Sequence, residues 1–582
     1  MRRILKRSVP VALLLLVTSC AGHEADFARS LAVKAPADMV LRGGKIVTLD
    51  DNFSTHQGVA IKDGRLLAIG TERDMRPLIG PATRVIDLAG RTVIPGLADS
   101  HIYASVAGLS WDADLHWEST RTLADALSQI GAATKTKPRG SWIVVGGGWV
   151  PTQFAERRFP SRADLDALAP YHPVYVQYLR QGALLNSAAL AAIGIAPGTP
   201  DPAGGKFERN PQTGEPTGWL QGVPAWQYAY AKIPQPTLAA TRQSLQNCFR
   251  ELNRLGITSI SDLQTNRVTF AHRRVLADMA RTGELPLRIN FYIGVEDSGD
   301  EIEHLKTTIE EIKSLHQSDH FRFGGFAVSI TSGSGRGPAN SNGGSIAEQE
   351  KERFRRLAQF FAEGGHNFQL RALNDSTARQ MLDVLEQVHS GTPFARHRMM
   401  FAELDDPSSD TIERIKKLGG GISVQDHMAL TGERNVEAWG LKKTRNAPPL
   451  RTMIQSGTPL SAGTGAFQSS SYSPMLALWW LVTGKTVAGS AIHNPAENLT
   501  RVEALKIYTV GSAWSTFEEG RKGSIEVGKY ADLAVLNADY FTVSEEQIRS
   551  LQSVLTVVGG RIVYAAGPFE QAGRIKKERG SK

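Results

Sequence analysis

The sequence predicts an α/β protein with three parts: a (β/α)8 TIM-like barrel, a small β-sandwich domain formed from both chain ends, and an insertion after barrel strand 1. Three observations predict this fold. Between residues 93 and 465, strand-like apolar runs alternate with amphipathic helical stretches. Strand-like segments joined by Gly- and Asp-rich turns lie near both chain ends. Residues 112–235 form a stretch too long for one crossover between neighbouring strands.

The apolar runs are the expected barrel strands. Helical stretches such as residues 350–365 and 377–389 separate them, as expected for βα units around a parallel sheet. Eight such strands are enough to close a barrel, and active sites in this architecture lie at the carboxyl ends of the strands. The expected strands are VIPGLAD (93–99), GITSISDL (256–263), LRINFYIG (287–294), GGFAVSI (324–330), FQLRAL (368–373), RMMFAEL (398–404), GGISVQD (420–426) and PLSAGTG (459–465).

The two chain ends are expected to form one small β-domain. GGKIVTL (43–49) near the start is echoed by GGRIVYA (559–565) near the end. The expected organisation is a lipoprotein signal peptide (1–20), a tether (21–37), the first part of the β-sandwich (38–92), the barrel (93–518) with an inserted subdomain at about 112–235, the second part of the β-sandwich (519–570) and a basic tail (571–582).

Composition excludes some classes of function. The chain has 66 basic and 58 acidic residues, spread along its 582 residues, for a net charge of +8. No basic stripe interleaved with aromatic residues is present, so nucleic acid is not an expected partner. With only two cysteines, the protein has no expected disulfide framework. One of them, Cys248, lies in a helix-like stretch and is predicted to be a packed core residue.

The N-terminus indicates export. MRRILKR is a basic segment, and VPVALLLLV after it is too short to span a bilayer. The following residues Val17 to Cys20 resemble a bacterial lipobox that is cleaved before a lipid-modified cysteine. The alternative is an ordinary signal peptide with an incidental cysteine. The lipobox predicts a protein anchored by Cys20 to a membrane of the bacterial envelope and facing the periplasm, and Ala21 favours the outer membrane.

The end of the first expected barrel strand carries the first candidate site residues. His101 and Tyr103 are two places apart, so in a strand both side chains point the same way. Two histidines at this spacing would be a metal-binding pair. Here the second residue is a tyrosine.

The chain resembles the amidohydrolase superfamily, specifically the amidohydrolase-3-type branch near the N-acyl amino acid deacylases. The resemblance extends from Met39 to about Gly567. It implies a metal-dependent barrel whose members hydrolyse carbon–nitrogen bonds other than peptide bonds. Strings that carry it include VIDLAGRTVIPGLADSH, WIVVGGGW, PSRADLDALAP, DPAGGKFERN, EPTGWL, EALKIYTVGSAW and KGSIEVGKYADLAVLN.

The resemblance also implies a set of metal ligands, which this sequence mostly lacks. The family takes two histidines from strand 1, a lysine from strand 4, a histidine each from strands 5 and 6, and an aspartate from strand 8. An arginine on strand 5 would repel zinc, at a cost of about 8 kcal/mol at roughly 4 Å and an effective dielectric constant near 20. We therefore expect no metal cofactor, and zinc or another divalent ion only if the chain has stayed a hydrolase. The family positions fall, in strand order, at His101, Tyr103, Ala327, Arg371, Phe401 and Gly465.

Several polar residues are expected to meet at the barrel mouth. His101 is a candidate general base or a residual, structurally bonded histidine. Arg371 is expected either to hold a carboxylate or phosphate ligand or to pair with a nearby acid such as Asp375. The Gly- and Ser-rich stretch 329–346 is a lid, an anion-binding nest or a surface loop. Tryptophans of the insertion, Trp142, Trp149, Trp219 and Trp226, suit a pocket wall or core packing equally well. The expected ligand-binding residues are Tyr103, Arg371, Asp375, Gln425 and His427.

Together these observations predict an exported lipoprotein of the amidohydrolase fold whose metal site is degraded, and which acts as a small-ligand-binding or regulatory pseudoenzyme. The expected partners are a small molecule, for which a carboxylate is one option, and a membrane through the lipid anchor. The alternative is an active hydrolase of an amide, N-acyl amino acid or cyclic amide that uses a non-standard or metal-free site. The family includes proteins named exoenzyme regulators, which makes a non-catalytic role compatible with the resemblance.

Overall fold

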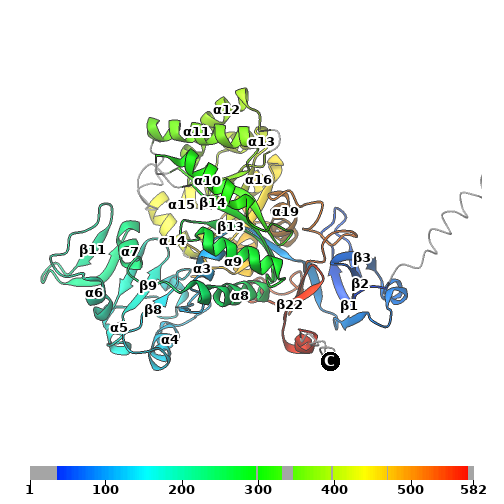
Figure 1. The fold of residues 1–582 in the computed structure, drawn as a ribbon, viewed down its shortest axis with the longest axis horizontal. Helices are drawn as coiled ribbons and strands as arrows, with labels where there is room; N and C mark the ends of the chain where they lie inside the picture. Colours follow the sequence, from blue (N-terminus) through cyan, green and yellow to red (C-terminus); the bar gives the residue numbers. More distant parts are fainter. Residues whose placement is uncertain (1–35, 296–298, 331–344, 395–396, 468, 574–582) are drawn as a thin grey trace, which may run out of the picture.

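A computed structural model describes residues 36–295, 299–330, 345–394, 397–467 and 469–573. The predicted signal peptide with Cys20, most of the tether, most of the loop 329–346 and most of the basic tail lie outside the described residues. Three sheets organise the fold. The barrel lies in the middle of Figure 1, with the insertion on one side and the β-domain on the other.

The central sheet has eight parallel strands in the order β19-β18-β17-β16-β15-β14-β13-β6. Its two end strands meet, because the Gly465 amide just past β19 donates to the carbonyl oxygen of His101 in β6 at 2.8 Å. The predicted (β/α)8 barrel is thus confirmed. The strands are β6 (Leu97–Ile102), β13 (Ile257–Gln264), β14 (Arg288–Gly294), β15 (Phe321–Ser329), β16 (Phe368–Arg371), β17 (Met400–Ala402), β18 (Gly421–Gln425) and β19 (Leu460–Gly463).

Amphipathic helices cover the outside of this barrel (Figure 1). Their apolar faces and the outward side chains of the strands share one large core. Cys248 of α8 is fully buried in that core, as predicted. The covering helices include α8 (Leu238–Arg254), α9 (Phe270–Arg281), α10 (Glu301–Lys313), α11 (Glu348–Gly364), α12 (Asp375–Gly391), α13 (Ser409–Lys417) and α16 (Leu450–Ser456), and the mouth carries α3 (Ala104–Gly108), α14 (His427–Trp439) and α17 (Pro474–Thr483).

One strand prediction needs correction, because residues 93–99 do not form one barrel strand. Thr92–Pro95 is β5 and pairs with strands of the β-domain, whereas the barrel strand β6 begins at Leu97. The switch between the two sheets occurs at Gly96. A Cβ there would lie 2.2 Å from Thr258 Oγ1, so only glycine lets the chain pass this close to β13.

The β-domain is built from both chain ends, as predicted. Its sheet has the order β22-β21-β20-β5-β1-β2-β3, with β4 paired to β1, and surrounds its own apolar core. In Figure 1 the blue N-terminal strands and the red β22 lie on the same side of the barrel. The strands are β1 (Met39–Val47), β2 (Thr55–Lys62), β3 (Arg65–Gly70), β4 (Arg84–Asp87), β5, β20 (Leu533–Leu536), β21 (Ser553–Val558) and β22 (Arg561–Ala565).

The insertion lies between α3 and α8 and has its own six-stranded sheet, in the order β11-β12-β10-β9-β8-β7. Apolar cores lie on both faces of this sheet. Trp149 is fully buried in one core, and Trp226 packs in the other. The elements are β7 (Asp114–Leu115), α4 (Leu123–Thr136), β8 (Ile143–Val145), α5 (Arg162–Leu168), β9 (Val174–Tyr178), β10 (Gly182–Leu185), α6 (Ser187–Ile193), β11 (Lys206–Arg209), β12 (Pro216–Gln221) and α7 (Val223–Tyr230).

Within the described part of the chain, no helix combines the length and apolar character needed to cross a membrane.

Candidate functional site

His101 lies at the carboxyl end of β6, in the centre of the barrel mouth. Its side chain is almost completely buried. Nδ1 donates to Gln369 Oε1 at 2.9 Å, and the Gln369 amide in turn donates to the Ser100 carbonyl oxygen at 3.1 Å. This leaves Nε2 facing Glu403 Oε1 at 3.5 Å. The ring is therefore fixed between an amide and a carboxylate from two other strands.

Arg371 forms an ion pair with Glu403. Its Nε donates to Glu403 Oε2, and the Glu403 side chain is only 2% exposed. The Glu403 backbone amide donates to Gln425 Oε1, which holds this residue at φ +58° just past β17. Burial lowers the pKa of Arg371 to about 10, so the guanidinium is still a cation at neutral pH. Of the two alternatives for Arg371, pairing with an acid is the one observed, although the partner is Glu403 and not Asp375.

Asp375 is not brought to this cluster. It begins α12, and its Oδ1 accepts from the Ser408 amide at 2.7 Å and from the Thr411 hydroxyl. Those residues belong to the start of the next helix, α13. Asp375 therefore connects two outer helices, which is a structural role.

Gln425 and His427 do lie at the mouth. Gln425 Nε2 donates to Ser423 Oγ at 2.8 Å, and this hydroxyl lies 2.8 Å from Ser100 Oγ. His427 begins α14 and is half-buried next to Gly465. A Cβ on Gly465 would lie 2.6 Å from His427 Nε2, and the glycine has φ +64°. Position 465 thus has no room for the aspartate that the family places there.

Ala327 and Phe401 face different sides of the sheet. Ala327 is in register with Gln369, so it lies on the inner face, where it presents no polar atom. Phe401 is in register with Leu370 and faces outward into the core under the helices. The predicted strand 6 position therefore points away from the mouth. On this strand, Glu403 is the residue that reaches the centre.

Two central residues, Glu403 and Gln369, were not among the predicted site residues. Glu403 was detectable, because it is the only acid in RMMFAEL and stands where the family's RxxHxE-type string ends in glutamate. Gln369 shares the inner face of β16 with Arg371, two places away. An uncharged amide on a short strand offered no comparable signal.

The donors at this centre do not suit a zinc ion. A zinc site needs three or four nitrogen, sulfur or oxygen ligands. Here the groups that face one another are the His101 imidazole and the Glu403 carboxylate, and this carboxylate is already paired with a guanidinium. Throughout the described residues, no group of three or more His, Cys, Asp or Glu side chains could hold a metal ion.

A cavity of about 580 Å³ lies above this centre, between the barrel mouth and the insertion. Tyr103 belongs to both regions, since its ring lines the cavity and stands edge-on to the His101 ring at 5.7 Å. Arg180, just past β9, also lines the cavity, and its charge is close enough to help lower the pKa of Arg371. Arg180 forms no ion pair with any described residue. Trp226 lines the wall, so this tryptophan contributes to both pocket and core.

The cavity has an acidic end formed by β7 and the residues directly after it. Asp114, His116 and Glu118 line it together, and none of them was among the predicted site residues. Burial raises the pKa of Asp114 to about 7 and the pKa of Glu118 to about 8. Burial lowers the pKa of His116. The chain thus gathers two buried carboxyl groups and an imidazole on the cavity wall, with the charge of Arg267 close enough to lower the pKa of Asp114.

Comparison with known proteins identifies the family. The chain is 26% identical over 557 residues to the N-substituted formamide deformylase of Arthrobacter pascens, covering 90% of this chain and 98% of that protein. It is 26% identical over 536 residues to the putative amidohydrolase YtcJ of Bacillus subtilis (strain 168), covering 90% and 99%. An uncharacterized metal-dependent hydrolase from Pyrococcus horikoshii OT3 has the same fold, with a TM-score of 0.64 at 19% identity over 87% of this chain and 99% of that one. The Amidohydrolase family model matches residues 84–564. The chain belongs to the amidohydrolase family.

Proposed function

We propose that this amidohydrolase-family protein binds a small organic molecule in the cavity at the barrel mouth, in a binding or regulatory role without metal-dependent hydrolysis. The observation that carries the proposal is the buried ion pair between Arg371 and Glu403. It puts a fixed positive charge at a position where the family resemblance implies a metal-binding histidine. A carboxylate is the ligand group that Arg180, which lines the cavity, would hold.

Electrostatic repulsion supports a site that works without a metal cofactor. Glu403 already has its charge neutralised by Arg371. A divalent ion beside Arg371 would meet a repulsion of about 8 kcal/mol at roughly 4 Å and an effective dielectric constant near 20. His101 alone does not offset this, since its Nε2 is a single ligand atom and a zinc site needs three or four. The proposed site is therefore organised by an organic cation in place of a metal ion.

Metal analysis of protein purified without chelator tests this proposal. After incubation with zinc, manganese or ferrous iron and gel filtration, we expect far less than one equivalent of retained metal. The same measurement on the Arg371→His variant shows whether removing the guanidinium raises retention. About one equivalent of tightly bound metal in the unmodified protein would overturn the proposal.

A metal-free hydrolase is a second candidate, favoured by the geometry of His101. Its Nε2 faces Glu403 at 3.5 Å while Gln369 fixes Nδ1, which is an arrangement suited to a general base. The substrates to test are N-acyl amino acids and N-substituted formamides, the latter taken from the name of the Arthrobacter relative. Turnover that is lost in His101→Ala but retained in Glu215→Gln, an exposed position in the insertion, supports this candidate. Equal rates in both variants contradict it.

We also propose that the protein is exported and anchored in the bacterial envelope through Cys20, facing the periplasm and sorted to the outer membrane. The lipobox-like residues before Cys20 support this. The protein is expected in the membrane fraction, and Cys20→Ser with an alternative signal peptide is expected to release it into the soluble periplasmic fraction. An unmodified protein that is already soluble would contradict lipid anchoring.

A further inference from the structure

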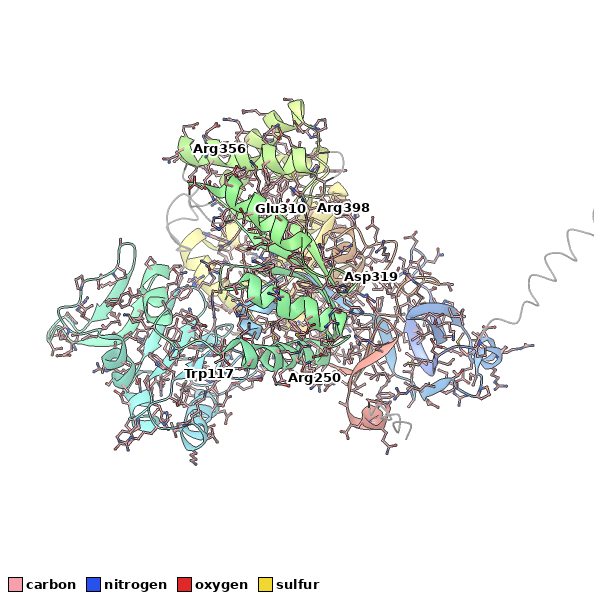
Figure 2. The ribbon with its side chains drawn as sticks, viewed as in Figure 1. Trp117, Arg250, Glu310, Asp319, Arg356 and Arg398 are labelled. Carbon is pink, nitrogen blue, oxygen red and sulfur yellow. The ribbon has the colours of Figure 1, made fainter. Side chains whose placement is uncertain are left out.

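Asp114, His116 and Glu118 occupy alternate positions of a segment that begins at β7 and enters a turn at Glu118. Side chains of extended residues alternate between two faces. The intervening Leu115 and Trp117 pack into the core of the insertion, with Trp117 fully buried. Figure 2 labels Trp117 on the side of the insertion next to the barrel. The three polar residues therefore face the cavity together.

Glu118 is a buried carboxyl group to which its own backbone amide donates, but no other described residue does. Its side chain is 6% exposed, and its Oε2 is buried with no hydrogen-bond partner among the described residues. The closest basic atom is His116 Nδ1, 4.0 Å from Oε1. Because His116 Nε2 faces the Trp111 carbonyl oxygen at 3.2 Å, Nε2 is the ring nitrogen that carries the proton. A neutral His116 thus presents an acceptor to Glu118, not a donor.

The other charged groups around Glu118 supply no hydrogen-bond donor to its carboxyl group. Glu251 of α8 and Asp114 are acids and raise its pKa further. Glu251 is already bound by Arg254 and by the Tyr472 hydroxyl. These neighbours leave an uncompensated acidic end on the cavity, of a kind that buried sites in proteins usually avoid.

Asp114, at the same end of the cavity, has closer partners than Glu118 has. Its Oδ2 accepts from Ser110 Oγ at 2.8 Å. The charges of Arg267 and Lys137 lower its pKa against the effect of burial. Arg267, however, donates to the Tyr230 hydroxyl at 2.6 Å and stacks on that ring, and forms no ion pair with Asp114 among the described residues. Glu118 is therefore the acid left for a ligand.

Aromatic rings border the same end. Phe467 lines the cavity beside Glu118, and the Trp111 ring stands edge-on to it at 5.6 Å. His116 stacks on Trp111 with ring centroids 3.8 Å apart. Aromatic faces next to a carboxylate favour organic cations over inorganic ones, since they attract the charge and also cover the apolar groups around it.

We propose that Asp114, His116 and Glu118 form a subsite for the protonated amine of the ligand, with Glu118 as its direct hydrogen-bond acceptor. This inference rests on the proposed function, because it assigns a ligand group to the same cavity. The amine would donate one N–H to Glu118 and leave its carbon chain against Phe467. Since an empty subsite holds the Glu118 proton, an ammonium ion that binds the carboxylate releases this proton to solvent.

Isothermal titration calorimetry with full-length protein in detergent tests the subsite with three matched probes: 2-phenylethylamine, the neutral 2-phenylethanol and the anion 3-phenylpropanoate. We expect the amine to bind more tightly than the alcohol. Its affinity should rise about tenfold from pH 7 to pH 9, because the ionised fraction of Glu118 rises by that factor around a pKa of about 8. Titrations at pH 7 in two buffers of different ionisation enthalpy should show proton release.

Variants separate the subsite from the rest of the cavity. Glu118→Gln should weaken amine binding at pH 9 at least tenfold, remove most of its pH dependence and leave the alcohol and 3-phenylpropanoate unchanged. Glu215→Gln is the matched control and should change none of these, and melting curves verify that both variants fold. If Glu118→Gln binds the amine as tightly as the unmodified protein does, the subsite proposal is overturned.

The two proposals fail differently. If 3-phenylpropanoate binds and Arg180→Ala weakens it while the amine binds no better than the alcohol, the amine subsite is wrong and the proposed function stands. If none of the three probes binds, the ligand-binding function and the subsite both fall.

Discussion

At the scale of single residues, the Arg371–Glu403 pair determines what the barrel centre can do. A buried ion pair contributes modestly to stability as a whole, but loss of one partner leaves an uncompensated charge. Glu403 is 2% exposed and Arg371 15%, so solvent cannot replace a missing partner at the carboxylate. Arg371 and Glu403, which occupy the centre in place of a metal ion in the proposed function, therefore also stabilise the fold.

Arg371→Met is expected to lower the free energy of unfolding by about 3 kcal/mol, because Glu403 is then buried without its counter-charge. The double variant Arg371→Met/Glu403→Gln should recover at least half of this loss, since the charge and its partner are removed together. Urea unfolding at pH 7 measures both values. A single-variant cost below about 1 kcal/mol would mean that water or another cation compensates Glu403.

Glu118 is expected to make stability depend on pH in an unusual direction. Its pKa is 4.5 without burial and about 8 in the folded protein, so between these values the folded state binds more protons than the unfolded state. The contribution of Glu118 to stability therefore falls as pH rises from about 4.5 to about 8. One pKa unit corresponds to about 1.4 kcal/mol, and partial hydration of the cavity offsets some of the total.

Glu118→Gln should accordingly stabilise the protein at pH 9, by on the order of 3 kcal/mol, and have little effect at pH 4.5. Denaturant unfolding at several pH values measures this difference. Glu215→Gln, with an exposed carboxylate, should follow the unmodified protein throughout. Parallel stability curves for Glu118→Gln and the unmodified protein would contradict a buried, protonated Glu118.

At the scale of elements, the segment after β19 connects the barrel centre with the cavity. Thr464 binds the buried Asp99 through its amide and hydroxyl, and the Gly465 amide bonds the His101 carbonyl oxygen. Phe467, two residues further, lines the cavity next to Glu118. The family's aspartate falls at position 465 of this short loop. In this chain the side chain of His427 leaves room only for glycine there.

Gly465→Asp should therefore not restore a metal site. The substituted residue would have a positive φ that non-glycine residues rarely adopt, and its Cβ would meet His427 Nε2 at 2.6 Å. We expect a loss of about 1–3 kcal/mol in the free energy of unfolding, with Gly465→Ala close to the same value. Metal retention should not increase. Stoichiometric zinc in Gly465→Asp would show that the loop adapts.

At the scale of the whole molecule, the barrel and its two appended sheets followed from apolar periodicity, because buried strands and amphipathic helices leave regular patterns. The ends of strands were less predictable where the chain passes from one sheet to another. In the sequence, Gly96 looks like part of one continuous apolar strand. Its close approach to Thr258 shows why one strand ends before it and another begins after it. The candidate site was predictable where an expected ligand was replaced, as at Arg371. It was not predictable where an uncharged side chain meets His101 across the fold, as with Gln369, or where an insertion contributes a residue, as with Glu118.

The barrel and the β-domain are joined by a buried ion pair. Arg288 of β14 donates through Nε and Nη2 to both oxygens of Asp532, at 2.8 and 3.1 Å, directly before β20. Both side chains are at most 4% exposed, and the guanidinium stacks on Tyr530 at 3.9 Å. The Gly559 amide binds the same carboxylate at 2.8 Å. These contacts join two sheets that each have their own core.

We expect the two sheets to unfold as one cooperative unit through this contact. Arg288→Ala should cost about 3–5 kcal/mol, because Asp532 is then buried without its cation. Hydrogen exchange should show that amides of β14 and β20 lose protection together. The control is Arg521→Ala, which breaks an exposed pair with Asp319 and should cost less than about 1 kcal/mol. If Arg288→Ala lowers protection in β20 alone, the β-domain is an independent folding unit that is only docked on the barrel.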